Sequence, residues 1–246
     1  MSGRDARVRV VGVVVPARDE ERLLGRCLRA LGDAVRLLTV ERPDVRARVV
    51  VVLDGCLDDS AGVVARAPWP EGADRPVVLT TRPRGVGAAR AAGAADALEA
   101  ARTAGVEDHE TWLAGTDADS AVPPQWLLAQ VAAAERGADA WVGTVVLPGG
   151  GLSGLWGAQQ EHREGHAHVH GANLGVRASA YLAAGGYPPL SSGEDVALVD
   201  GLAGTGARLV RTARWPVLTS DRLVGRAPDG VAADLRELSL ETDGAA

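Results

Sequence analysis

The sequence predicts an α/β fold with a mostly parallel central sheet flanked by helices. Short apolar runs rich in Val alternate with segments of helical periodicity through residues 8–147. These runs are apolar at almost every position, as in strands that are covered by helices on both faces. Alternation of strands and helices implies right-handed βαβ units, and therefore a parallel sheet.

The elements of the first half follow from local patterns. Pro16 ends the first strand, and apolar positions from Leu23 to Leu38 recur at helical spacing. A short helix begins near Asp58, and an Ala-rich helix covers 85–102. Pro123-Pro124 opens the next helix, where proline is tolerated. The predicted strands are 8–15, 48–53, 77–79, 111–115 and 140–147.

After residue 147 the order of elements changes. Helices are predicted at 152–165, 179–184 and 194–203, and strands at 173–177 and 207–218. We expect one domain, 1–246, made of two halves, 8–147 and 148–238. Residues 239–246 are small and polar and are expected to form a frayed tail.

Composition excludes some classes of function. The net charge is −6 and the pI is near 5.4, which argues against a nucleic-acid-binding role. No apolar run has the length of a transmembrane segment, and the charged N-terminus lacks the apolar core of a signal peptide. We expect a cytoplasmic protein, with peripheral membrane contact and the oligomeric state left open.

Two carboxylates follow the predicted strand 111–115. Asp117 and Asp119 stand one residue apart, where open α/β sheets place ligands beyond the carboxyl ends of strands. Divalent cations such as Mg²⁺ or Mn²⁺ bind to one or two carboxylates together with substrate phosphates. The pair therefore predicts a metal–diphosphate site.

Five segments in order resemble family-2 glycosyltransferases of the GT-A fold. Residues 14–21 resemble the first strand and turn of that family, and residues 50–60 its second-strand motif, with Leu53 and Cys56 replacing an Asp and a Ser. Residues 84–90 are similar to its Gly-x-x-x-Ala-Arg-Asn segment, with Ala91 in place of Asn. Asp117-Ala118-Asp119 matches its Asp-x-Asp motif, and 185–188 with 193–195 match its acceptor-side motif. The resemblance covers 8 to about 225.

The resemblance implies a donor site in the half 8–147. Asp54 would accept a hydrogen bond from the base, as uracil N3–H requires, although guanine and thymine could use the same carboxylate. Pro16, Ala17 and Arg18 would line the base pocket with Glu20 nearby, and Arg84 and Arg90 would face the diphosphate. Asp119 would bind Mg²⁺ or Mn²⁺, and Asp117 would hold the ribose or a metal-bound water.

The resemblance places the acceptor in the half 148–238. Asp195 would be the general base that takes the acceptor's proton, which implies single displacement with inversion. Glu194 would orient Asp195 or the acceptor. Ordinary N-terminal helix charge is the alternative for both residues. The partners expected are a nucleotide sugar and an unidentified hydroxyl acceptor.

Four histidines lie close together in the sequence: His162, His166, His168 and His170. A metal site, an acceptor or sugar pocket lined by His168 and His170, and an exposed loop all remain open. Asn173, the single Asn of the chain, favours the pocket.

Many members of the family place a metal-binding His after the last strand, where this chain has 218–222 instead. Asp221 or a His from 166–170 could be the third ligand.

Two other classes of function are considered. A nucleotidyltransferase is disfavoured because the turn 16–21 lacks glycines. A degenerate sugar-nucleotide-binding protein is disfavoured because the acidic residues are retained.

Overall fold

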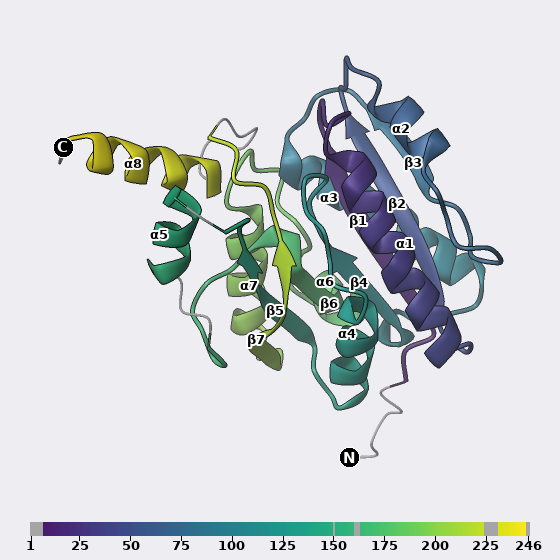
Figure 1. The fold of residues 1–246 in the computed structure, drawn as a ribbon. Helices are drawn as coiled ribbons and strands as arrows, with labels where there is room; N and C mark the ends of the chain where they lie inside the picture. The colour runs from purple at the N-terminus through teal and green to yellow at the C-terminus, as the bar shows by residue number, and fades with distance from the viewer. Residues whose placement is uncertain (1–6, 150, 160–162, 224–230, 245–246) are drawn as a thin grey trace.

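The computed structural model describes residues 7–149, 151–159, 163–223 and 231–244. A seven-stranded sheet of order β3-β2-β1-β4-β6-β5-β7 forms its centre (Figure 1). The strands are β1 Val10–Ala17, β2 Arg46–Asp54, β3 Val77–Thr81, β4 Thr111–Gly115, β5 Ala140–Val146, β6 Leu174–Arg177 and β7 Leu209–Leu218. β6 is antiparallel to β4 and β5, and the other strand pairs are parallel. The predicted, mostly parallel α/β fold is confirmed.

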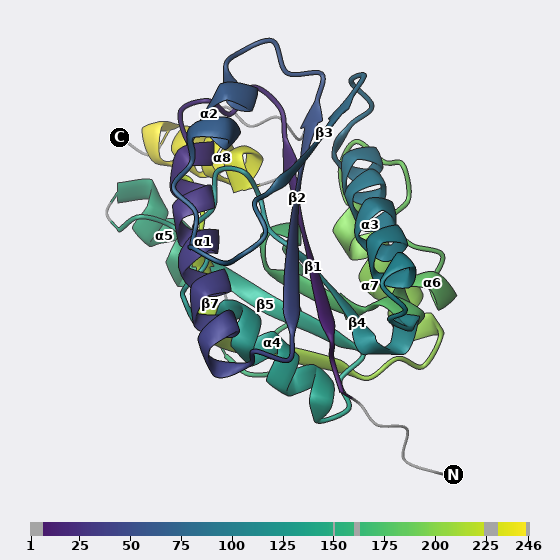
Figure 2. The same cartoon turned by 90° about the vertical axis from the view of Figure 1, so that its right-hand side faces the viewer.

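Helices cover both faces of this sheet. They are α1 Leu24–Glu41, α2 Ser60–Arg66, α3 Val86–Thr103, α4 Trp126–Glu135, α5 Gly151–Gln159, α6 Ala178–Ala183, α7 Glu194–Gly204 and α8 Val231–Gly244, with short 3₁₀ turns η1 Asp108–Glu110 and η2 Gly171–Asn173. α1 and α4 lie on one face, and α3, α6 and α7 on the other (Figure 2). Within the described helices, none is both long and apolar enough to span a membrane.

Two apolar layers hold the helices against the sheet. One contains Leu28 and Leu31 of α1 with Trp126 of α4, and the other contains Ala94 and Ala97 of α3 with residues of α6 and α7. α3 approaches the sheet closely because glycines face it. A Cβ on Gly12 would lie 2.6 Å from the Cβ of Ala97. This close packing fixes the position of α3 relative to β1.

The structure differs from the prediction at several element ends. The helix predicted at 152–165 ends at Gln159, and residues 163–165 form a bend and a turn. Pro16 lies inside β1, opposite Val52 of β2, rather than ending the strand. β4 pairs with β1 only as far as Val14, so no neighbour on that side needs the missing N–H of Pro16. At the other end of the chain, α8 continues to Gly244, so 239–244 are helical and not an irregular tail.

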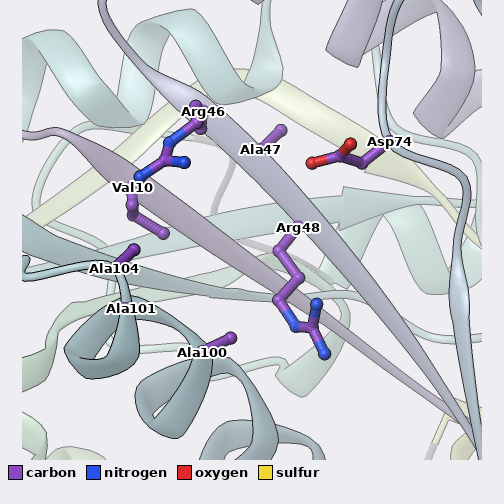
Figure 3. Close-up of a pocket in the computed structure, with 8 residues that line it drawn as sticks. All are labelled: Val10, Arg46, Ala47, Arg48, Asp74, Ala100, Ala101 and Ala104. Carbon is purple, nitrogen blue, oxygen red and sulfur yellow. The ribbon is translucent and has the colours of Figure 1, made fainter.

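A shallow depression of about 120 Å³ lies at the amino ends of β1 and β2. Val10, Arg46 and Arg48 line it together with Ala104, next to the end of α3 (Figure 3). Arg48 forms an ion pair with Asp96 of α3, with 2.7 Å between Nη2 and Oδ1. The depression is therefore at the opposite end of the strands from the predicted site.

Candidate active site

The two carboxylates of the predicted metal site lie at the edge of the sheet formed by the carboxyl ends of the parallel strands. From β1 the chain adds β2 and β3 on one side, and β4 later pairs with the other side of β1. The order therefore reverses between β1 and β4, and ligands of open α/β sheets bind beyond the carboxyl ends of strands at such a point. Asp117 and Asp119 follow β4 at this edge, beside the end of β1.

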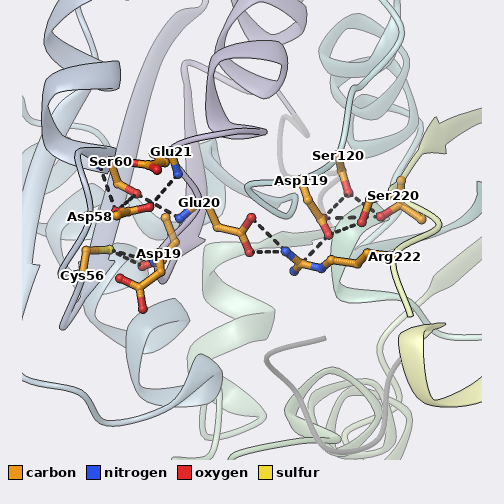
Figure 4. A network of polar contacts seen from close by, with 12 residues as sticks. Asp19, Glu20, Glu21, Cys56, Asp58, Ser60, Asp119, Ser120, Ser220 and Arg222 are labelled. Carbon is orange, nitrogen blue, oxygen red and sulfur yellow. Dashed lines mark hydrogen bonds and ion pairs between the residues drawn. The ribbon is translucent and has the colours of Figure 1, made fainter. Parts of the chain in front are cut away.

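Asp119 is buried and its carboxylate is surrounded by donors. Its Oδ1 accepts hydrogen bonds from Ser120 Oγ at 3.2 Å and Thr219 Oγ1 at 3.4 Å. Its Oδ2 accepts one from Ser220 Oγ at 2.6 Å and forms an ion pair with Arg222 Nη2 at 3.1 Å (Figure 4). Each oxygen therefore has two partners within the chain.

A backbone bridge brings residues 219–222 to Asp119. Ala121 and Leu218 exchange hydrogen bonds, with N···O distances of 2.7 Å and 3.1 Å. This bridge joins the segment after β4 to the end of β7. The sequence identified 218–222 as the segment that replaces the usual metal-binding His. It did not predict that Thr219, Ser220 and Arg222 contact Asp119.

Asp117 belongs to a second charged network, centred on Arg90. Arg90 of α3 donates from Nη2 to Asp117 Oδ1 at 2.5 Å and from Nε to Glu194 Oε1 at 2.9 Å. Its guanidinium carbon lies 5.9 Å from the centre of the Tyr187 ring. Arg90 is buried between the carboxylates of Asp117 and Glu194, so it does not face an open diphosphate site as predicted. Glu194 is buried against Arg90, and its role in orienting Asp195 or the acceptor stays a prediction.

The carboxyl group of Asp117 has a perturbed pKa. Burial raises it to about 6, Arg90 opposes the shift, and Asp119, Glu194 and Asp195 add to it. A carboxylate that is surrounded by other carboxylates in this way favours a bound cation.

Asp195 lies beside the second half of the sheet. Its Oδ2 accepts a hydrogen bond from the backbone N–H of Gly171 at 2.6 Å, and its Oδ1 accepts one from Val196 N–H at 2.9 Å. These bonds fix the orientation of the carboxylate, and each oxygen keeps a further lone pair.

Asp54, at the end of β2, is buried and holds the loop before α3. Its Oδ1 accepts hydrogen bonds from Thr81 Oγ1 and the Arg84 N–H, and its Oδ2 accepts one from the Gly85 N–H. The carboxylate thus orders the loop, and one of its roughly four lone pairs remains for a base. The Arg84 side chain itself is exposed.

The loop after β1 places the other predicted donor residues. Ala17 is buried, Pro16 is half-buried and Arg18 is exposed. Glu20 is buried and both of its carboxylate oxygens accept from Arg222 Nη1, at 2.7 Å and 2.9 Å. The Arg222 guanidinium therefore bridges the carboxylates of Glu20 and Asp119. The sequence did not predict this bridge.

The histidines of 166–170 stack along one extended segment. The ring centres of His166, His168 and His170 are 6.2 Å and 6.1 Å apart, and Trp156 of α5 lies 6.2 Å from His170. His166 is fully buried, with Nε2 3.3 Å from the Thr212 carbonyl oxygen. His162 lies outside the described residues. The row ends at His170, next to the Gly171 N–H that binds Asp195.

Asn173 does not line a pocket, contrary to the prediction. Its Oδ1 accepts from the indole N–H groups of Trp126 and Trp141, at 2.9 Å and 3.1 Å. Its Nδ2 donates to the carbonyl oxygens of Thr144 and Trp215. The amide is fully buried and uses all of its donors and acceptors inside the fold.

Another acidic group joins the loops after β1 and β2. Asp19, Cys56 and Asp58 place ligand atoms within 4.8 Å of one another. These atoms accept hydrogen bonds from the backbone of the two loops. Cys56 Sγ accepts one from the Asp19 N–H. Asp19 Oδ1 accepts one from the Leu57 N–H, and Asp58 Oδ2 accepts one from the Glu21 N–H. Figure 4 shows that Ser60, Glu20 and Arg222 connect this group to Asp119. The group serves to join the two loops.

The residues around Asp117 and Asp119 fit a hard divalent cation. The five carboxylates of Glu20, Asp117, Asp119, Glu194 and Asp195 outnumber the three guanidinium groups of Arg26, Arg90 and Arg222. Oxygen donors of this kind suit Mg²⁺ and Mn²⁺. Across the described part of the chain, neither Asp117 nor Asp119 belongs to a group of three His, Cys or acidic ligands, so the remaining ligands would be donor phosphates and water.

Solved structures share this fold at low sequence identity. TarS of S. aureus, residues 1–349, aligns with a TM-score of 0.60 and 16% identity over 95% of this chain and 65% of that one. A mannosyltransferase of Pyrobaculum calidifontis, solved with GDP-Man and Mn²⁺, gives 0.56 and 19% over 86% and 56%. Glucosyl-3-phosphoglycerate synthase of Mycobacterium tuberculosis, solved with phosphoglyceric acid, gives 0.53 and 18% over 94% and 80%.

The chain covers less than two thirds of the TarS fragment and of the mannosyltransferase. No curated protein matches the sequence. The family model for glycosyl transferase family 2 matches residues 12–181, which is more than half of the chain. The protein therefore belongs to glycosyl transferase family 2 and has the GT-A fold.

Proposed function

We propose that the protein transfers a sugar from a nucleoside-diphosphate sugar to a hydroxyl acceptor, with inversion and with Mg²⁺ or Mn²⁺ as cofactor. A UDP-sugar is the first donor to test. The observation that carries the proposal is the position of Asp117 and Asp119. They follow β4 at the point where the strand order reverses, in a surplus of carboxylates.

The donor's diphosphate would lie at this edge. Asp119 and Asp117 would hold the metal, which supplies stabilisation of negative charge on the departing nucleoside diphosphate. Arg84 is exposed on the loop that Asp54 orders, so it can reach phosphate oxygens from the α3 side. Arg90 acts indirectly by holding Asp117 and Glu194 in place.

Asp195 would take the proton from the acceptor hydroxyl. Its carboxylate is oriented by the N–H groups of Gly171 and Val196, and lone pairs remain for the incoming hydroxyl. Because the base and the leaving diphosphate act on opposite sides of the sugar, the configuration is inverted. His168 and His170 lead to Gly171, which favours them as lining of the acceptor pocket.

The carboxylate at the end of β2 determines which nucleotides belong in the test. The carboxylate of Asp54 suits uracil N3–H, but guanine offers an N–H donor as well. The mannosyltransferase of similar fold was solved with GDP-Man and Mn²⁺, so both nucleotides belong in the test.

The test is a thermal-shift screen of UDP-, GDP- and TDP-sugars, each with and without Mn²⁺. A ligand at 100 times its Kd stabilises a protein by about 2.7 kcal/mol. We expect a rise in melting temperature that requires both one nucleotide sugar and Mn²⁺, and that is lost in Asp119→Asn. Asp200→Asn is the matched control, because Asp200 is exposed on α7 and is not among the predicted site residues. An equal shift in Asp119→Asn would contradict the proposed site.

A further inference from the structure

Arg222 is a cation supplied by the chain itself at the predicted metal ligand. It follows β7, and its guanidinium joins carboxylates from two other segments (Figure 4). Nη1 donates to both oxygens of Glu20, at 2.7 Å and 2.9 Å. Nη2 lies 3.1 Å from Asp119 Oδ2.

This arrangement already places one cation at Asp119 Oδ2. Ser220 Oγ donates a hydrogen bond to Oδ2 at 2.6 Å, and the Arg222 guanidinium lies 3.1 Å from the same oxygen as an ion pair. A divalent cation that binds Oδ2 must therefore share this oxygen with the guanidinium or displace it. Displacement of the guanidinium is favoured, because two positive charges near one oxygen repel each other.

The two ends of the guanidinium are held differently. Glu20 is 6% exposed and binds Nη1 with both oxygens, whereas Arg222 is 29% exposed. Glu20 can therefore keep Nη1 at the site while Nη2 changes its partner. A phosphate oxygen is the partner that a guanidinium N–H binds best in place of a carboxylate.

We propose that Arg222 competes with the divalent metal for Asp119, and that its Nη2 passes to the donor's diphosphate when metal and donor bind together. This proposal rests on the proposed function. It makes Arg222 a positioning residue that keeps the metal site closed without donor. Metal alone then binds weakly, and metal and nucleotide strengthen each other's binding.

The test measures the Mn²⁺ dissociation constant by the electron paramagnetic resonance signal of free Mn²⁺, without nucleotide, for the wild type and Arg222→Gln. Removal of the competing cation should tighten Mn²⁺ binding by about tenfold, which corresponds to one charge-assisted contact. In the presence of UDP or GDP, the strengthening of Mn²⁺ binding by nucleotide should be smaller in Arg222→Gln than in the wild type.

Arg26→Gln is the matched control. Arg26 Nη2 donates to the backbone carbonyl of Asp119, at 2.7 Å, and not to its carboxylate. This change removes a nearby positive charge without freeing Oδ2. Equal tightening in Arg26→Gln would mean a general charge effect and would overturn the proposal. Melting temperatures without metal show that the variants are folded.

Two further outcomes separate this proposal from the proposed function. If Arg222→Gln binds Mn²⁺ no more tightly than the wild type, while Asp119→Asn abolishes Mn²⁺ and donor binding, the competition is disproved and the donor site stands. If neither the wild type nor Arg222→Gln binds Mn²⁺ in a manner that requires Asp119, both proposals fail.

Discussion

Asn173 illustrates how one side chain can be essential without touching a ligand. Its amide joins Trp126 of α4, two residues of β5 and Trp215 of β7. A Cβ on Gly143 would lie 2.3 Å from the Asn173 amide, so glycine is needed there to make room. The backbone of Trp215 is left-handed, with φ of 60°, and the bond from Asn173 holds its carbonyl. Asn173 therefore fixes the meeting of β5, β7 and α4.

We expect Asn173→Ala to lower the free energy of unfolding by about 3 kcal/mol or more. The change leaves two indole N–H groups and two carbonyl oxygens without their partner, and each unpaired buried group costs about 1–3 kcal/mol. Urea denaturation measures the loss. Gln125→Ala is the control, since Gln125 precedes α4 without a side-chain cap bond. Equal midpoints for the two variants would disprove the structural role of Asn173.

At the scale of elements, Arg42 connects the end of α1 to two others. It donates to both oxygens of Asp44, just before β2, and to both oxygens of Glu135 at the end of α4. Hydrogen bonds from Arg42 hold the pKa of Asp44 well below its usual range, and they also lower the pKa of Glu135.

This ion-pair group makes stability depend on pH. Both carboxyl groups have lower pKa values in the folded state, so their contribution is present above the unfolded values near 4 and is lost as the pH falls below them. We expect Arg42→Met to lower the free energy of unfolding by about 1 kcal/mol at pH 7. At pH 3 the free energies of unfolding of the variant and the wild type should differ by less.

Urea denaturation at both pH values measures this difference. Arg36→Met is the control, because Arg36 and Asp33 form an exposed pair whose removal should change little. A difference that stays constant between pH 7 and pH 3 would contradict the role of Arg42.

At the scale of the whole molecule, the sequence predicts the sheet better than the contacts of the site. Strands such as β2 and β4 are buried on both faces, so their apolar runs mark them within one or two residues. The antiparallel direction of β6 has no such local signal, because it depends on pairing between β4 and β5.

In the candidate site, too, positions are easier to predict from the sequence than contacts. The positions of Asp117 and Asp119 could be predicted from the strand that precedes them. The residues that contact them could not be predicted, because Arg90 reaches Asp117 from α3 and Arg222 reaches Asp119 from beyond β7. These contacts depend on the reversal of strand order and on the bridge between Ala121 and Leu218, which are properties of the complete fold.

The most direct measurement compares donor binding with turnover in Asp195→Asn. Using the nucleotide sugar that gives the largest thermal shift, we would measure its Kd and, with Mn²⁺, the rate of nucleoside diphosphate release as the sugar is transferred to water in place of the hydroxyl acceptor. Removal of a general base typically costs about 10²–10⁴-fold in rate, so we predict a loss of at least about 100-fold with an unchanged Kd. Asp200→Asn, exposed on the same helix, should release nucleoside diphosphate at the wild-type rate. Release by Asp195→Asn at the wild-type rate would contradict the placement of catalysis at this edge of the sheet.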